Sequence, residues 1–113
     1  MIKLIVCDLD GTLLNDRKQL DSQILEVLNA LRKKHILFTL ATGRNEAIAR
    51  DYVDQLGIEI PYAADNGANL YCCHRLLQSE SLKKKDSEWI LTRLMEERIP
   101  FTYFDQQCGY GFS

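Results

Sequence analysis

Two aspartates, Asp8 and Asp10, are the residues of this sequence best placed to do chemistry. They stand in the run Asp-Leu-Asp-Gly-Thr, residues 8–12, directly after a short apolar segment. In open α/β sheets, ligands bind beyond the carboxyl ends of the strands, so both carboxylates would face a site. Two like charges held this close are costly without a cation, and Mg²⁺ prefers carboxylate oxygens. The run therefore predicts a magnesium site at a strand end, the competing interpretation being a polar turn whose aspartates only cap the loop.

A second motif, Ala-Thr-Gly-Arg at residues 41–44, follows another apolar segment. It brings together a hydroxyl at Thr42, a glycine N–H at Gly43 and the start of a predicted helix. These groups form a typical phosphate-binding corner, and Arg44 can add a charge-assisted contact. Alone, the motif is weak evidence, because it is more typical of a plain strand-to-helix turn. Beside the aspartates at the neighbouring strand end, it favours phosphate binding.

The two motifs and their surroundings resemble the haloacid dehalogenase superfamily. The matching text is KLIVCDLDGTLLN, then LATGR, then DNGANLY, so the resemblance runs from Lys3 to about Tyr71 and more loosely through the following helix. Within that superfamily it is most similar to the Cof-type branch of small-molecule phosphatases, in which a cap domain is inserted after the third core strand.

The resemblance implies a role for each motif position. Asp8 would be the nucleophile that forms an aspartyl-phosphate, and Asp10 the general acid and base. The Asp8 carboxylate and the Asp10 backbone carbonyl would bind Mg²⁺, the implied cofactor. The implied phosphate contacts are four: Thr42, Gly43, Arg44 and Asn66, the last two at the rim of the site. The implied substrate is a small phosphorylated metabolite, with sugar phosphates as the expected class.

Two features of the Cof-type branch have no counterpart in these 113 residues. Its members carry a later lysine that neutralises the phosphoryl group and a later Gly-Asp motif that completes the metal site. We therefore expect the chain to be the N-terminal part of such a phosphatase, inactive alone. Two alternatives stay open: a non-catalytic fragment that binds metal or phosphate or assembles with another chain, and a phosphotransferase or mutase of the same superfamily.

The elements that must position these residues alternate between strand and helix. Apolar runs predict strands over residues 2–7, 36–41 and 62–64. Helical spacing predicts one helix that Asp21 caps and that ends near His35, and a second between Asn45 and Gly57. Right-handed crossovers then give a Rossmann-like, doubly wound parallel sheet with helices on its faces, the N-terminal part of the superfamily's core. Without further strands, the strand beginning at Ile2 would keep an open edge, so self-association is expected.

The pattern changes after residue 67. Residues 68–73 and 76–79 predict a β-hairpin around His74-Arg75, which closes a first domain over residues 1–81. Residues 82–113 would begin an α+β cap: a solvated linker of lysines over 83–85, a helix that Asp86 or Ser87 caps, and a strand over 101–104. No closing element is predicted at the C-terminal CGYGFS.

Composition limits the remaining possibilities. A net charge of -2 gives no general attraction to nucleic acid or to anionic membranes, and no apolar run approaches the roughly 20 residues that span a bilayer. The N-terminal run has no signal-peptide cleavage site, so a cytoplasmic protein is expected. The four cysteines would then be reduced thiols. Cys72, Cys73 and His74 are adjacent, but neighbouring strand residues point to opposite faces, so we do not expect them to converge on a metal.

Overall fold

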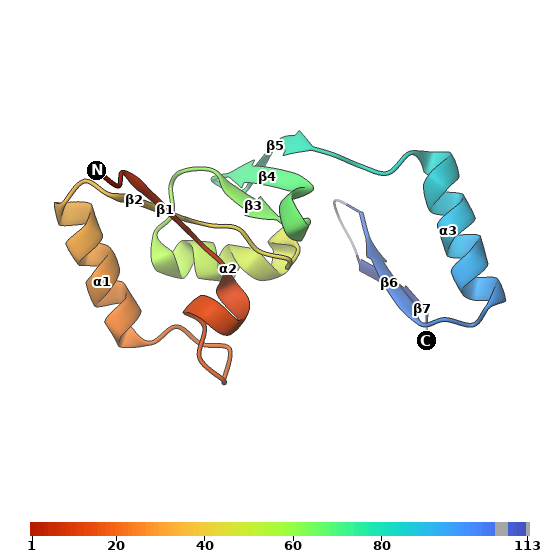
Figure 1. The fold of residues 1–113 in the computed structure, drawn as a ribbon, viewed down its shortest axis with the longest axis horizontal. Helices are drawn as coiled ribbons and strands as arrows, with labels where there is room; N and C mark the ends of the chain where they lie inside the picture. The colour runs from red at the N-terminus through yellow and green to blue at the C-terminus, as the bar shows by residue number, and fades with distance from the viewer. Residues whose placement is uncertain (106–108, 113) are drawn as a thin grey trace. The chain divides into compact units, whose positions relative to one another are not determined.

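The computed structural model describes residues 1–105 and 109–112 and contains two compact units, Met1–Glu80 and Ser81–Ser113. The first unit alternates strands and helices, and the second has one helix and a strand pair (Figure 1). In the part of the chain that the structure describes, no helix is long and apolar enough to cross a membrane.

The first unit is a mixed five-strand assembly with two helices (Figure 1). Its elements are β1 Leu4–Cys7, α1 Ser22–Lys33, β2 Leu37–Leu40, α2 Glu46–Leu56, β3 Tyr62–Ala64, β4 Asn69–Cys72 and β5 Arg75–Ser79. A tight turn over Leu9–Leu13 follows β1, and a short 3₁₀ turn over Asp65–Gly67 follows β3. The predicted order of strand, helix, strand, helix, strand and hairpin is therefore confirmed.

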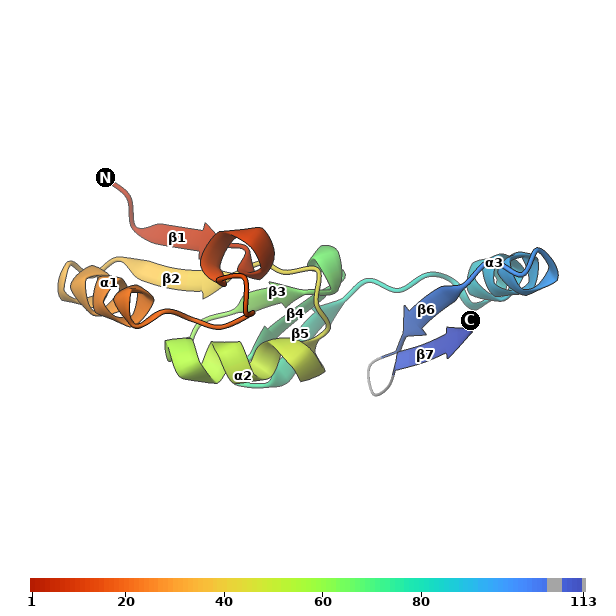
Figure 2. The same ribbon diagram turned by 90° about the horizontal axis from the view of Figure 1, so that it is seen from below.

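The strands lie side by side in the order β1, β2, β3, β4, β5 (Figure 2). β1 and β2 are parallel, with Leu4 opposite Leu37, and a parallel bridge from Ala41 to Ala63 links the end of β2 to β3. β3, β4 and β5 are antiparallel. The carboxyl ends of β1, β2 and β3 therefore share one edge of the sheet, as an α/β fold requires.

Both helices cover the same face of the sheet, and one hydrophobic core lies beneath them. Leu28 of α1, Val53 of α2, Leu40 of β2 and Tyr62 of β3 belong to a single buried cluster. In Figure 1 both helices are drawn below the strands. Successive right-handed crossovers that advance in one direction place their helices on one face. The α/β class is confirmed, whereas the expectation of helices on both faces is not met within these two crossovers.

The opposite face of β1 and β2 consequently exposes apolar side chains. Leu4, Val6 and Leu37 retain 47%, 55% and 52% of their accessible surface. Among the described residues β1 pairs with β2 alone, so its outer edge has no strand partner. An open edge beside an apolar face is the arrangement that the self-association prediction requires.

The helix ends of the first unit follow the local sequence. The Asn45 side chain accepts a hydrogen bond from the Ile48 N–H at 3.0 Å, and Gly57 ends α2 in the left-handed region with φ of 63°. Both predictions are confirmed. α1 begins directly after Asp21, but the Asp21 carboxylate accepts from the Asn15 amide at 3.1 Å and makes no capping bond to the helix.

The hairpin turn lies one residue earlier than predicted. β4 ends at Cys72 and β5 begins at Arg75, so the turn residues are Cys73 and His74 rather than His74 and Arg75. Both have positive φ, 51° and 62°. Two successive left-handed residues are the geometry of the tight turn that matches the twist of a two-residue hairpin.

The second unit corrects two predictions. Its helix, α3 Lys84–Glu96, begins two residues before Asp86, so most of the supposed lysine linker is helical. The Ser87 hydroxyl donates back to the Lys83 carbonyl at 3.3 Å, inside the first turn, and therefore does not cap the helix.

The second correction concerns the C-terminal segment. A strand that was not predicted, β7 Gly109–Phe112, pairs antiparallel with β6 Phe101–Phe104, and the rings of Tyr103 and Tyr110 stack 5.0 Å apart. The ring of Tyr110 thus packs against its cross-strand partner Tyr103, which is the kind of pair that stabilises two adjacent strands.

Candidate active site

Asp8 and Asp10 lie at the carboxyl end of β1, where the sequence predicts them. Asp8 is the first residue beyond β1, and its Oδ1 accepts a hydrogen bond from the Leu9 N–H at 2.8 Å. Leu9 has no accessible surface and fixes this turn to the core. Gly11 has φ of 72°, a conformation that disfavours residues with a side chain. Asp8 is exposed, and the turn fixes its carboxylate through Oδ1. The second carboxylate oxygen, Oδ2, takes no part in this hydrogen bond.

The Asp10 carboxylate forms a bidentate ion pair with Arg44. Arg44 Nε donates to Oδ2 and Nη2 donates to Oδ1, each at 2.7 Å, across 34 residues of sequence. Lys18 Nζ also donates to Oδ1, at 3.1 Å. The Arg44 hydrogen bonds, followed by the Lys18 bond, hold the pKa of Asp10 well below its usual range. The Asp10 carboxylate is therefore ionised, and both Arg44 and Lys18 form ion pairs with it. Sequence reasoning missed Lys18, which belongs to no motif.

The two predicted phosphate-binding segments are joined by backbone hydrogen bonds. The Asn66 N–H donates to the Thr42 carbonyl at 3.1 Å, and the Asp65 N–H donates to the Arg44 carbonyl at 2.9 Å. A Cβ placed on Gly43 would lie 2.8 Å from Asn66 Oδ1, so with any other residue at this position the Asn66 side chain would have to shift. The structure thus brings Thr42, Gly43, Arg44 and Asn66 together at the shared strand edge.

Thr42 is nearly enclosed by this arrangement. Thr42 is only 4% exposed, and its Oγ1 accepts a hydrogen bond from the Arg44 N–H at 3.1 Å. A hydroxyl that accepts one bond keeps its own O–H as a donor. Thr42 therefore fixes the turn that carries Arg44 and still has a proton to offer a ligand oxygen.

The donor set fits magnesium through Asp8 more directly than through the Asp10 side chain. Mg²⁺ binds one or two protein oxygens and keeps several waters or ligand oxygens. Asp8 offers an exposed carboxylate, whereas the Asp10 carboxylate is engaged by Arg44 and Lys18, so Asp10 would contribute through its backbone carbonyl. Within residues 1–105 and 109–112, no group of three or more His, Cys, Asp or Glu side chains could hold a metal ion.

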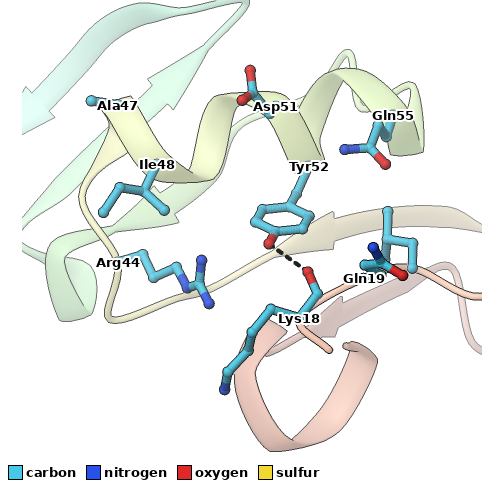
Figure 3. Close-up of a pocket in the computed structure, with 9 residues that line it drawn as sticks. Lys18, Gln19, Arg44, Ala47, Ile48, Asp51, Tyr52 and Gln55 are labelled. Carbon is cyan, nitrogen blue, oxygen red and sulfur yellow. Dashed lines mark hydrogen bonds between the residues drawn. The ribbon is translucent and has the colours of Figure 1, made fainter. Parts of the chain in front are cut away.

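A polar pocket of about 680 Å³ adjoins the ion pair (Figure 3). Lys18 and Arg44 line it on the side of the Asp10 pair, and Tyr52 of α2 lies between them. The Tyr52 hydroxyl donates to the Lys18 carbonyl at 2.7 Å, and the Arg44 guanidinium lies 5.4 Å from the centre of the Tyr52 ring. The Tyr52 contacts therefore support both cations that hold Asp10.

A second cluster of charged groups joins the hairpin turn to α2. Glu46 is only 7% exposed, and its carboxylate accepts from the Tyr62 hydroxyl and pairs with Arg50. His74 Nδ1 lies 3.1 Å from Glu46, and His74 Nε2 lies 2.8 Å from Asp54.

The charges of this cluster stabilise one another. Hydrogen bonds to Asp54 and then to Glu46 raise the pKa of His74. Burial raises the pKa of Glu46, but bonds from Arg50, His74 and Tyr62 together outweigh it and leave that pKa lowered. Sequence reasoning did not identify this cluster. The sequence feature that could have indicated it is the four-residue spacing of Glu46, Arg50 and Asp54, which places them on one side of a helix.

With this geometry established, comparison with known proteins defines the family. The chain belongs to the haloacid dehalogenase-like hydrolases, whose sequence profile matches residues 5–113. A putative phosphatase of Bacillus subtilis, YxeH, is 32% identical over 115 residues, which cover 97% of this chain and 43% of YxeH.

Two further comparisons agree. The HMP-PP phosphatase of Klebsiella pneumoniae is 31% identical over 86 residues, 76% of this chain and 30% of that protein. A solved haloacid dehalogenase-like hydrolase from Bacillus subtilis superposes with a TM-score of 0.80 at 32% identity, over 91% of this chain and 36% of its own. The chain thus spans less than half the length of the relatives it matches.

Proposed function

We propose that this chain carries the nucleophile and phosphate pocket of a Mg²⁺-dependent phosphatase that hydrolyses small phosphorylated metabolites. The observation that supports this most is the joining of the two motifs: Arg44 holds Asp10, and Asn66 is bonded to Thr42. The aspartates and the phosphate corner thereby share one strand edge. Sugar phosphates are the proposed substrate class.

In the proposed reaction, an Asp8 oxygen attacks phosphorus, and the bond from phosphorus to the leaving oxygen breaks. Asp10 gives its proton to that oxygen. Water then attacks the aspartyl-phosphate while Asp10 accepts a proton, and the bond from Asp8 to phosphorus breaks, which releases inorganic phosphate and restores the Asp8 carboxylate.

Arg44 must release Asp10 for this cycle to begin. An Asp10 carboxylate held by Arg44 and Lys18 is ionised and has no proton to donate. A bound phosphoryl group offers Arg44 an alternative anion, with two oxygens that the planar guanidinium can also bind in a bidentate way. We therefore propose that substrate draws Arg44 from Asp10 to the phosphoryl oxygens. This removes the larger of the two interactions that keep Asp10 ionised and leaves the Lys18 bond as the remaining one.

A magnesium ion held by Asp8 and the Asp10 carbonyl would neutralise charge on the phosphoryl oxygens. Thr42 and the Gly43 N–H would donate to the same oxygens and orient the group for in-line attack. These contacts stabilise charge that develops in the transition state, which is the main protein contribution to phosphoryl transfer.

The decisive test compares Asp8→Asn with wild type in the full gene product, with p-nitrophenyl phosphate and Mg²⁺ as reagents. An amide cannot form the acyl-phosphate, so turnover should fall by at least about a thousandfold. Asp16→Asn, at an exposed aspartate of the same segment, is the matched control and should keep activity within about twofold. Activity near wild type in Asp8→Asn would refute the nucleophile assignment.

Two further readouts separate the alternatives. The 113-residue chain alone should release no appreciable phosphate but should bind Mg²⁺ weakly by calorimetry, with the heat lost in Asp8→Ala. Equal heats from wild type and Asp8→Ala would contradict the metal assignment. Transfer of phosphate to an added sugar hydroxyl rather than to water would instead identify a phosphotransferase.

A further inference from the structure

The hairpin turn brings two thiols together that a regular strand would separate. Cys72 is the last residue of β4, and Cys73 is the first turn residue, with φ of 51°. Side chains alternate between faces only while the backbone stays extended. The left-handed conformation of Cys73 breaks this alternation, and the two Sγ atoms lie 3.9 Å apart. The expectation that these neighbours point apart is therefore wrong for the two sulfurs, while the His74 ring turns to α2.

The sulfur separation matches a metal chelate and not a disulfide. In a tetrahedral site with Zn–S bonds of about 2.3 Å, two sulfurs lie about 3.8 Å apart. Adjacent residues have Cα atoms about 3.8 Å apart, below the usual disulfide range of about 4.4–6.8 Å. The thiols already have the spacing that a d¹⁰ cation needs, whereas a bond between them would distort the backbone.

The turn that sets this spacing is anchored from outside. His74, the second turn residue, is held through both ring nitrogens by Glu46 and Asp54 of α2. The Cys72 side chain is also held in place, because its thiol donates a hydrogen bond to the Glu59 carbonyl, with Sγ 3.5 Å from the oxygen. Cys73 is exposed, so an ion can reach the pair from solvent. A pair fixed before binding loses less conformational freedom when it binds.

We propose that Cys72 and Cys73 form a two-thiolate site for a thiophilic d¹⁰ divalent cation, Zn²⁺ or Cd²⁺, with water in the remaining positions. Soft thiolate ligands select such ions over Mg²⁺ and Ca²⁺. The site is separate from the aspartates of the proposed active site and stands whether or not the phosphatase proposal holds.

The test uses a 113-residue protein in which Cys7 and Cys108 are replaced by serine, so that Cys72 and Cys73 are its remaining thiols. Cd²⁺ is titrated under a phosphine reductant, and the thiolate-to-cadmium absorption band is recorded. The expected result is saturation at one ion per chain. Cys72→Ser or Cys73→Ser in this background should weaken binding by at least about tenfold, because the second ligand acts at high effective concentration.

Two measurements keep the proposal testable if a serine variant unfolds. Cd²⁺ should slow alkylation of both thiols in the parent protein. His74→Ala, which frees the turn but keeps both thiols, should weaken Cd²⁺ binding, and circular dichroism checks that it remains folded. Unchanged binding in a folded single-cysteine variant, one ion for every two chains, or alkylation at the same rate with and without Cd²⁺ would each overturn the proposal.

Discussion

Gly43→Ala tests whether the phosphate corner depends on the close approach of Asn66. The new Cβ would lie 2.8 Å from Asn66 Oδ1, closer than nonbonded carbon and oxygen atoms normally come. Gly43 is not among the residues with positive φ, so alanine brings no backbone strain. The cost of the substitution therefore comes from the Asn66 contact alone.

Two opposing terms set the magnitude. Removing a glycine at a compatible position stabilises a protein by about 0.4–1 kcal/mol through the unfolded state. Overpacking costs about 1–3 kcal/mol, and the low end applies because Asn66 is exposed and its side chain can move. We expect Gly43→Ala to lower the free energy of unfolding by about 0.5 kcal/mol. In an Asn66→Gly background the clash is absent, and the same change should raise it by about 0.5 kcal/mol.

The assay is a double-mutant cycle by urea unfolding, followed by circular dichroism. Asn66→Gly is the suitable partner because Asn66 has φ of 56°, a conformation that glycine accepts without strain. The expected coupling is about 1 kcal/mol, a difference of roughly 0.3–1 M in the urea midpoint. A coupling below about 0.3 kcal/mol would mean that Asn66 does not rest on Gly43 and would refute this geometry of the corner.

Two further predictions concern the rest of the first unit. The pKa of His74 is raised by Asp54 and Glu46, so the stability that His74 adds should be complete below its unfolded pKa of about 6.5 and lost as pH rises through the higher folded value. His74→Ala should therefore lower the free energy of unfolding at pH 6 by less than about 1 kcal/mol, because the ring is partly exposed. At pH 9 the same substitution should change that free energy little. A loss of stability that grows with pH would contradict the two ion pairs of His74. The exposed face of β1 should make the isolated chain associate with increasing concentration, and Val6→Lys should reduce this in light scattering, while Glu26→Lys, an exposed change on α1, should not. A chain that stays monomeric at every concentration would show that the open edge of β1 finds no partner.

The sequence by itself determined the features that depend on a few neighbouring residues. Asn45 caps α2 and Gly57 ends it, because a cap bond and a left-handed residue are local events. The apolar run before Asp8 predicts a strand, and the motif after it predicts where the carboxylates emerge. The structure leaves one face of that strand exposed, at Leu4 and Val6. Together with the Ala-Thr-Gly-Arg motif, these signals were enough to predict the fold class and the family, and they placed the candidate site at the carboxyl ends of the strands but did not include Lys18.

Only the tertiary structure decided which distant groups meet. Arg44 reaches Asp10 across 34 residues, and His74 reaches Glu46 across 28. Both contacts depend on how the crossovers lay α2 against the sheet, and no local spacing encodes that placement. The same holds for Cys72 and Cys73, whose sulfurs lie close together because the two-residue turn between β4 and β5 places Cys73 in a left-handed conformation that cysteine does not prefer by itself. Local conformational preference does not favour these arrangements. They form because long-range packing supplies the free energy that stabilises them.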